Sequence, residues 1–203
     1  MAESRTTEPV LTEKFQRAFA LASEIHATQL RKKTSIPYMA HLMSVAALVL
    51  EYGGSEHAAI AGLLHDAVED SENGSKVEAR IRGEFGDRVA DIVLGCSDTV
   101  AVLGQPKPSW RERKAAYLQH LHAESDPDVL LVSACDKLHN TRSILGDLRV
   151  IGPVVWDRFT EHDPSAQLWN YESLSDLYER RMPGALSDEL KHTISQIRAL
   201  VAL

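Results

Sequence analysis

The sequence predicts an all-α fold, a compact bundle of about eight to eleven helices, from three observations. Apolar residues recur every three to four positions along most of the chain. No stretch shows the alternation of β-branched and aromatic residues that is typical of a strand. Capping residues, prolines and glycines divide the helical pattern into segments of ordinary length. With 203 residues, of which 44% are hydrophobic, the chain is predicted to form one domain, residues 1–203.

The first three helices are predicted from their capping and breaking residues. A first helix begins at Pro9, since proline is tolerated in a first turn, and ends near residue 30. A second helix follows Pro37 and ends at the glycine pair 53–54. Ser55 then caps a third helix, which is predicted to continue through an almost wholly apolar stretch.

The later helices are predicted to start at serine, aspartate or glycine, several with proline or glutamate in the first turn. Their predicted starts are Ser75, Gly86-Asp87, Ser109, Asp126-Pro127, Asp163-Pro164 and Ser187. The helix from Gly86-Asp87 should end near Asp98, and Pro183-Gly184 should close the helix that precedes the last one. Pro153 begins or kinks a short element. Two prolines predict a loop at 104–109.

Composition limits the classes of function. The net charge of −7 argues against general nucleic-acid binding. The two cysteines, Cys96 and Cys135, lie in apolar surroundings and are expected to be reduced thiols. No apolar run is long enough to span a membrane, and the N-terminal residues do not follow the plan of a signal peptide. A cytoplasmic location is therefore expected.

Four side chains form a candidate metal site: His41, the doublet His65-Asp66, and Asp136. The doublet interrupts the apolar stretch 58–68, which is predicted to be a buried helix. Ionisable groups in such a place are costly unless they are paired or bound to a metal. Two imidazoles and two carboxylates suit a divalent ion such as Mn²⁺ or Fe²⁺. The competing interpretation is a chance His-Asp dipeptide followed by solvated acids.

Two further acids, Glu69 and Asp70, follow the doublet by one turn. On a helix, Glu69 would share a face with His65 and Asp70 with Asp66. Such a position suits a group that takes a proton from water at the metal. The spacing does not decide which of the two acids acts as the base.

Longer strings identify a family resemblance. The order His…His-Asp…Asp resembles the signature of the HD phosphohydrolase superfamily, and four strings resemble the hydrolase domain of the RelA/SpoT alarmone enzymes. These strings are HATQLRKKTSIPYMAH (26–41), GLLHDAVED (62–70), FGDRVADIV (85–93) with Ser97-Asp98, and CDKLHNTRSI (135–144). The match covers about residues 12–182 and is greatest to small stand-alone alarmone hydrolases, including the metazoan SpoT homologue.

The resemblance implies an activity and a cofactor. It implies removal of the 3′-diphosphate from guanosine tetra- or pentaphosphate, to give pyrophosphate and GDP or GTP. It favours one Mn²⁺ held by the four candidate ligands, while the ligand types do not exclude Fe²⁺, Zn²⁺ or Mg²⁺. Glu69 and Asp70 match the catalytic pair of members that are competent in hydrolysis.

The resemblance also implies a set of substrate contacts: Arg31, Lys32, Tyr38, Asn140, Arg142, Trp169 and Tyr171. Arg31 is expected to stack on a base and Lys32 to meet phosphate. Asn140 shares a helical face with Asp136 and can donate to ribose or phosphate. Tyr38 would line the same wall, although core packing competes with this role.

Three of these assignments stay open. Arg142 serves phosphate or merely braces the fold. Trp169 and Tyr171 are two residues apart on a helix, so only one of them is expected to face the nucleotide. His120 and His122, which could serve a second metal ion, are interpreted as surface residues, and His139 receives the same interpretation.

Competing functions are weighed on the same residues. Other HD nucleotide phosphohydrolases act on adenine alarmones, NADPH or deoxynucleotide phosphates, and a non-catalytic alarmone-binding module is a third class. The Val-Glu-Asp string and the Arg31-Lys32 pair argue against a deoxynucleotide phosphatase, and the intact acids against a mere sensor. Stand-alone hydrolases of this kind can act as antitoxins, so a toxic alarmone synthetase is a candidate partner. No synthetase domain is expected in a chain of this length.

Overall fold

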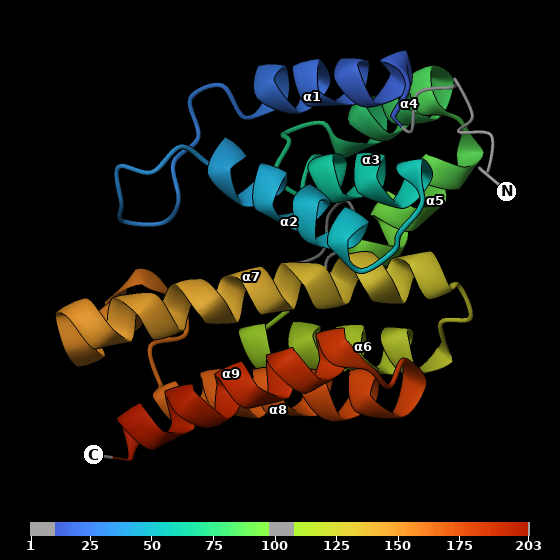
Figure 1. Cartoon of the computed structure of the whole chain (residues 1–203). Coiled ribbons are helices and arrows are strands. Elements are labelled where there is room, and N and C mark those ends of the chain that lie inside the picture. Colours follow the sequence, from blue (N-terminus) through green and yellow to red (C-terminus); the bar gives the residue numbers. More distant parts are fainter. Residues whose placement is uncertain (1–10, 98–107, 203) are drawn as a thin grey trace, which may run out of the picture.

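The computed structural model describes residues 11–97 and 108–202, and within these ranges the named elements are all helical (Figure 1). This confirms the predicted all-α class. The elements are α1 (Glu13–Ile25), α2 (Met39–Glu51), α3 (Glu56–Leu64), α4 (Gly74–Phe85), α5 (Asp87–Cys96), α6 (Trp110–Ala123), α7 (Pro127–Ile151), the 3₁₀ helix η1 (Gly152–Arg158), α8 (Pro164–Arg181) and α9 (Ala185–Val201). Extended backbone in the described ranges pairs at one isolated bridge, between Leu30 and Pro37.

The long helix α7 runs through the middle of the molecule (Figure 1). Helices α2, α3 and α5 pack on one side of it, and α8 and α9 on the other. A helix covered on two sides needs apolar residues around most of its circumference, which α7 has in its first three turns, from Val129 to Leu138. Asp136 lies within this buried stretch and is therefore held in the interior.

Helices α2 and α3 lie close together because a glycine faces the contact. A Cβ at Gly62 would lie only 3.2 Å from the Cα of Ala46, so a larger residue would push the helices apart. His41 projects from α2, and His65 follows directly after α3. This close packing therefore brings the two imidazoles to the same place.

Several predicted caps are confirmed. Ser109 caps α6 in a capping box with Glu112. Asp126 caps α7, and Asp163 caps α8, each followed by proline in the first turn. Helix α8 ends at Arg181, shortly before Pro183-Gly184, which was predicted to close it.

Other predicted boundaries were wrong. The first helix ends at Ile25 rather than near residue 30, because residues 26–38 form a loop that is closed by backbone bonds such as Tyr38 N–H to Gln29 O. Asn73, not Ser75, caps α4, since its side chain accepts from the Lys76 N–H. Ser187 is the third residue of α9, where its hydroxyl accepts from the Gly184 N–H. Pro9, Asp98 and most of the predicted 104–109 loop lie outside the described residues.

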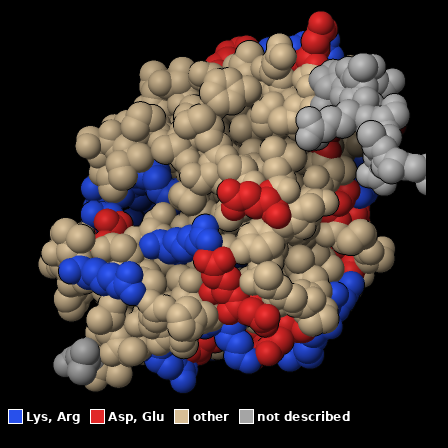
Figure 2. All heavy atoms as spheres, in the orientation of Figure 1, with Lys and Arg blue, Asp and Glu red and all other residues tan. Residues whose placement is uncertain are grey.

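The described surface carries charges of both signs. Figure 2 shows acidic and basic side chains interspersed on one face, beside a broad uncharged area. Both thiols are sheltered, and burial raises the pKa of Cys135 to about 12. Among the described residues, no helix is both long and apolar enough to cross a membrane.

Candidate metal centre and substrate pocket

The His65-Asp66 doublet lies in a turn, not in the helix where it was predicted. Helix α3 ends at Leu64, and the chain continues as a turn with the bond from the Asp70 N–H to Asp66 O at 2.9 Å. Consecutive residues of a regular helix point about 100° apart. After the helix ends, the two side chains converge instead, with His65 Nε2 and Asp66 Oδ2 3.1 Å apart.

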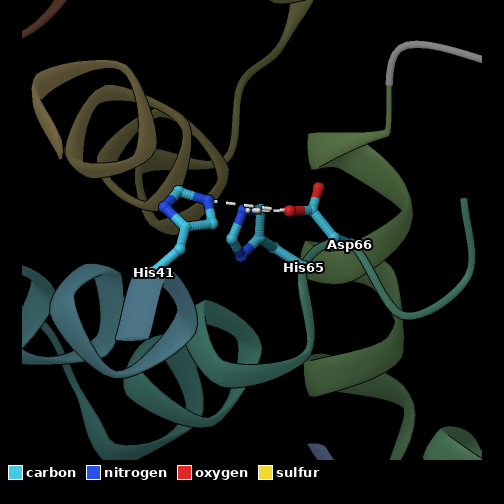
Figure 3. A group of neighbouring side chains, drawn as sticks. All are labelled: His41, His65 and Asp66. Atoms are coloured by element: carbon cyan, nitrogen blue, oxygen red, sulfur yellow. Dashed lines mark ion pairs between the residues drawn. The ribbon is translucent and has the colours of Figure 1, made fainter. Parts of the chain in front are cut away.

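Three of the four candidate ligands form one compact group. The potential ligand atoms of His41, His65 and Asp66 all lie within 4.8 Å of one another (Figure 3). His41 comes from α2, and the other two come from the turn after α3 (Figure 3). His41 Nε2 is 3.7 Å from Asp66 Oδ2. The tertiary fold thus joins residues that are 24 positions apart in sequence.

Asp136 adds a carboxylate from α7. Its Oδ1 lies 3.2 Å from His41 Nε2 and 3.7 Å from His65 Nε2. Lys137 Nζ donates to its Oδ2, and Asn140 Nδ2 to its Oδ1, both at 2.5 Å. These bonds fix the carboxylate so that Oδ1 faces both imidazoles.

Electrostatics keep the carboxylates ionised. Burial alone would raise the pKa values of Asp66 and Asp136, yet His65 holds the pKa of Asp66, and Lys137 that of Asp136, well below the usual value. Burial also opposes charge on His65, but Asp66 and Asp136 outweigh it and hold the pKa of the imidazole well above its usual value. The cluster therefore attracts a cation, which is either a proton or a metal ion.

The donor set fits a divalent metal. The buried His65 contacts Gly62 O through Nδ1 at 2.9 Å, so that Nδ1 is the donor and Nε2 is the atom left to bind either a proton or a metal ion. His65 Nε2 is buried and makes no hydrogen bond. Adjacent ligands of an octahedral ion with bonds of about 2.1 Å lie about 3.0 Å apart. The separations of 3.1 to 3.7 Å are close to this spacing.

Two neighbours hold these candidate ligands in place. Tyr38 donates a hydrogen bond from its hydroxyl to Asp66 Oδ2 at 2.5 Å. Tyr38 was predicted to line the substrate pocket, but in the structure it contacts a candidate ligand. His139 Nδ1 lies 2.7 Å from His41 Nδ1. His139 was interpreted as a surface residue, which is wrong, because it is half-buried behind the cluster and burial lowers its pKa to about 4. Its spacing of three residues from Asp136 on one helix could have revealed it.

A polar pocket of about 330 Å³ adjoins the cluster. It is lined by Lys32, Glu69, Asp70, Trp110, Arg113, Lys114, Lys137, Asn140, Phe159, Thr160, Gln167, Asn170 and Tyr171. Lys137 and Asn140 both line this pocket and bond Asp136. The pocket therefore opens directly beside the candidate metal centre.

Both predicted catalytic acids line the pocket and are exposed. Gln29 Nε2 donates to Asp70 Oδ2 at 2.7 Å, and the Oε1 atom of Gln29 lies 2.5 Å from Nδ1 of the buried His26. The orientation of Asp70 is thus set by the loop before α2. Glu69, the preceding residue, also lines the pocket.

The predicted substrate residues separate into two groups. Lys32, Asn140 and Tyr171 line the pocket. Arg31 Nη2 donates to Asn140 Oδ1 at 3.1 Å and so stands one residue behind the lining.

Arg142 and Trp169 are not among the lining residues. Arg142 pairs with Glu189 of α9, which favours the bracing alternative. Trp169 packs against Trp110 and lies 4.2 Å beneath the guanidinium of Arg111. Of the two aromatic candidates, Tyr171 is therefore the one at the pocket, and burial raises its pKa to about 12.

Several pocket residues were missed from the sequence. Arg113 and Lys114 lie on α6, and Gln167 and Asn170 on α8. In the sequence, the pair Arg113-Lys114 looks like part of a solvent-exposed helix face. The spacing of Gln167 and Asn170 does not distinguish amides that line a pocket from amides that face solvent. His120 Nε2 donates to Gly95 O at 3.1 Å, away from the candidate ligands. Among the described residues, His41, His65 and Asp66 form the one group found that could hold a metal ion.

Comparisons with known proteins identify the family of the chain and agree with its fold. Residues 18–149 match the sequence profile of a family described as an HD domain. Over 131 residues the chain is 39% identical to a probable GTP pyrophosphokinase of Mycobacterium leprae, and over 136 residues 32% identical to a guanosine-3′,5′-bis(diphosphate) 3′-pyrophosphohydrolase of Aquifex aeolicus. These matches span 64% and 67% of this chain but only 16% and 18% of the relatives.

Solved structures cover more of the chain. A metazoan ortholog of SpoT, described as hydrolysing ppGpp and playing a role in starvation responses, superposes with a TM-score of 0.72 at 25% identity. This similarity covers 96% of the chain and 99% of that protein. A protein from Listeria monocytogenes has a TM-score of 0.65 at 30% identity, over 77% of this chain and 97% of its own.

Proposed function

Since the chain belongs to the HD-domain family, we propose that it is a metal-dependent pyrophosphohydrolase. Its substrate in this proposal is guanosine tetra- or pentaphosphate, from which it removes the 3′-diphosphate to give pyrophosphate and GDP or GTP. The observation that carries the proposal is the pocket that joins Glu69 and Asp70 to a set of cations beside the His-Asp cluster. The names of the Aquifex and metazoan relatives support the choice of substrate.

The metal in this proposal is one Mn²⁺, held by His41, His65, Asp66 and Asp136. The separations of their donor atoms and the buried His65 Nε2, which makes no hydrogen bond, support it. When bound, such an ion activates the attacking water and polarises the phosphoryl group. Fe²⁺, Zn²⁺ and Mg²⁺ share enough of this chemistry that the family resemblance, not the ligand set, favours Mn²⁺.

One of the two acids, Glu69 or Asp70, takes up the proton that the attacking water loses. Both carboxylates border the pocket, on the turn that follows the doublet. Gln29 holds Asp70 by one oxygen, which leaves the other oxygen for the reaction. A carboxylate oriented in this way is prepared to accept a proton without first reorganising.

The cations of the pocket bind the phosphates. In this proposal the cation Lys137 and the neutral amide of Asn140 hold the diphosphate that is cleaved, which is supported by their bonds to Asp136 and their place in the pocket lining. Lys32, Arg113 and Lys114 supply charge for the second diphosphate. This local set of cations explains how a chain with a net charge of −7 binds a polyanion.

Two finer parts of the proposal concern the cell. We place the protein in the cytoplasm, where nucleotide alarmones are found. We assign it an antitoxin role toward a small alarmone synthetase, whose product it would destroy. Co-expression with such a synthetase should restore growth, and the Asp136→Asn variant should not.

The direct test is product analysis. The purified protein, loaded with Mn²⁺, is incubated with guanosine, adenosine and deoxynucleotide phosphates and with NADPH. We expect guanosine 3′-diphosphates to give pyrophosphate and a plain 3′ hydroxyl, with label from ¹⁸O-water appearing in the pyrophosphate. Inorganic phosphate as first product, or turnover of deoxynucleotide monophosphates alone, would replace the proposal with a different HD phosphohydrolase activity.

A further inference from the structure

His139 lies directly behind His41, one turn along α7 from Asp136. The two Nδ1 atoms are 2.7 Å apart, and the ring centroids are 4.8 Å apart. A hydrogen bond between two imidazole nitrogens needs a proton on one and a lone pair on the other. The pair therefore has two arrangements, which differ in whether the proton belongs to His41 or to His139.

Arg31 distinguishes these two arrangements. Its Nη1 lies 3.5 Å from the same Nδ1 of His139, and its Nη2 donates to Asn140 Oδ1 at 3.1 Å. A guanidinium can only donate, so it faces a lone pair and not an N–H group. His139 Nδ1 is consequently the acceptor, and the Nδ1 proton belongs to His41.

The position of this proton matters at the other side of the His41 ring. A neutral imidazole with its proton on Nδ1 keeps a lone pair on Nε2. In His41, Nε2 is the atom that faces Asp66 at 3.7 Å and Asp136 at 3.2 Å. In the reverse arrangement a proton would occupy Nε2 and would exclude a metal ion from that nitrogen.

We propose that His139 is a positioning residue that fixes His41 in the form able to bind metal, with Arg31 selecting the arrangement. The inference rests on the metal site of the proposed function. Outer partners of ligating histidines fix the ring and its protonated nitrogen in this way in other metal sites. Arg31 reaches both ends of the cluster through adjacent residues of α7, since Asn140 holds Asp136 as His139 holds His41.

The test compares two substitutions that share the branching of His139 at Cγ. His139→Asn keeps an acceptor oxygen near the position of Nδ1, whereas His139→Leu places a methyl group there. Titration with Mn²⁺ should show an affinity about 10- to 100-fold weaker for His139→Leu. His139→Asn should keep most of the affinity, and thermal unfolding without metal should show that both variants are folded.

A second measurement reads the proton itself. Long-range proton–nitrogen correlation spectra of the Zn²⁺-loaded protein should show His41 with its proton on Nδ1. A proton on Nε2, or equal Mn²⁺ affinity in the unsubstituted protein and in His139→Leu, would overturn the inference alone. If the unsubstituted protein binds no ion in a manner that depends on His65, the proposed function fails, and the inference fails with it.

Discussion

In the candidate metal centre the candidate ligands are largely buried and held by neighbours, whereas the acids and some of the cations of the adjoining pocket are exposed. His41 and His65 are 2% and 3% exposed, and Asp136 is held by two bonds from its own helix. Glu69, Asp70 and Lys32 have exposed side chains. The cluster is thus prepared before any ligand arrives, and the pocket can adjust to what it binds.

The two regions also differ in where their residues come from. The cluster is built from α2, α7 and the turn after α3, which pack against one another in the core. The pocket adds residues of α6, α8 and the segment after η1. We infer that substitutions in the cluster abolish the chemistry, and that substitutions in the pocket alter the affinity for substrate.

The largest effect is expected at the cluster. Asp136→Asn removes the charge that faces both histidines, so metal binding and activity should be lost together. The ion is expected to stabilise the transition state by several kcal/mol, so its loss should lower kcat by about 10³-fold or more. Elemental analysis should find one ion per unsubstituted chain and almost none in the variant. Two ions per chain would contradict the single site.

The next largest effect is expected at Glu69 and Asp70, which follow the His65-Asp66 doublet and line the pocket. Glu69→Gln and Asp70→Asn should each lower kcat while metal content stays unchanged, because these acids handle a proton and do not hold the ion. Positioned acids and bases contribute about 10²- to 10⁴-fold. The acid whose substitution lowers kcat more is the base. Loss of the metal in either variant would show instead that this acid helps to hold the metal ion.

A smaller effect is expected within the pocket. Lys32→Ala removes one charged contact of about 1.5–3 kcal/mol, so KM should rise at least about tenfold while kcat changes little. Arg31→Ala should differ from it, since Arg31 also bonds Asn140 and contacts His139. Steady-state kinetics and Mn²⁺ titration of both variants provide the measurement. A pure KM effect in Arg31→Ala would show that its contacts with α7 do not matter.

The smallest effect lies outside both regions. Arg142 and Glu189 form an ion pair with side chains 43% and 39% exposed, and Tyr52 donates its hydroxyl to the same carboxylate. Arg142→Ala should therefore lower the free energy of unfolding by no more than about 1 kcal/mol. Urea unfolding and KM together test this. A tenfold rise in KM would return Arg142 to the substrate role that its motif predicted.

Low pH should weaken the contacts of Glu189 with Arg142 and Tyr52. The bond from Tyr52 and the pair with Arg142 hold the pKa of Glu189 below its usual value. Such a carboxyl stabilises the fold above the pKa of the unfolded chain, and this contribution is lost as the pH falls through the lower folded pKa. The difference in stability between the unsubstituted protein and Glu189→Gln should accordingly vanish in acid.

The sequence was enough to predict the helical class, most caps and the four candidate ligands. Caps such as Ser109 and Asp163 act within one turn of chain, and a doublet inside an apolar stretch is visible without coordinates. The bent exit from α3 was not predictable, because an apolar helical pattern continues through residue 68. The convergence of His65 and Asp66 depends on that exit.

The doublet in its apolar stretch and the order of motifs indicated which residues could hold a metal; tertiary packing decided what surrounds them. The spacing of His139 from Asp136 indicates a shared face of one helix, but the packing of α2 against α7 decides that His139 contacts His41. Arg142 and Lys32 both lie in family strings, yet one pairs with Glu189 and the other borders the pocket. Caps and helical faces depend on neighbours within about four residues, whereas the partners of His139 and Arg142 lie 98 and 47 positions away along the chain.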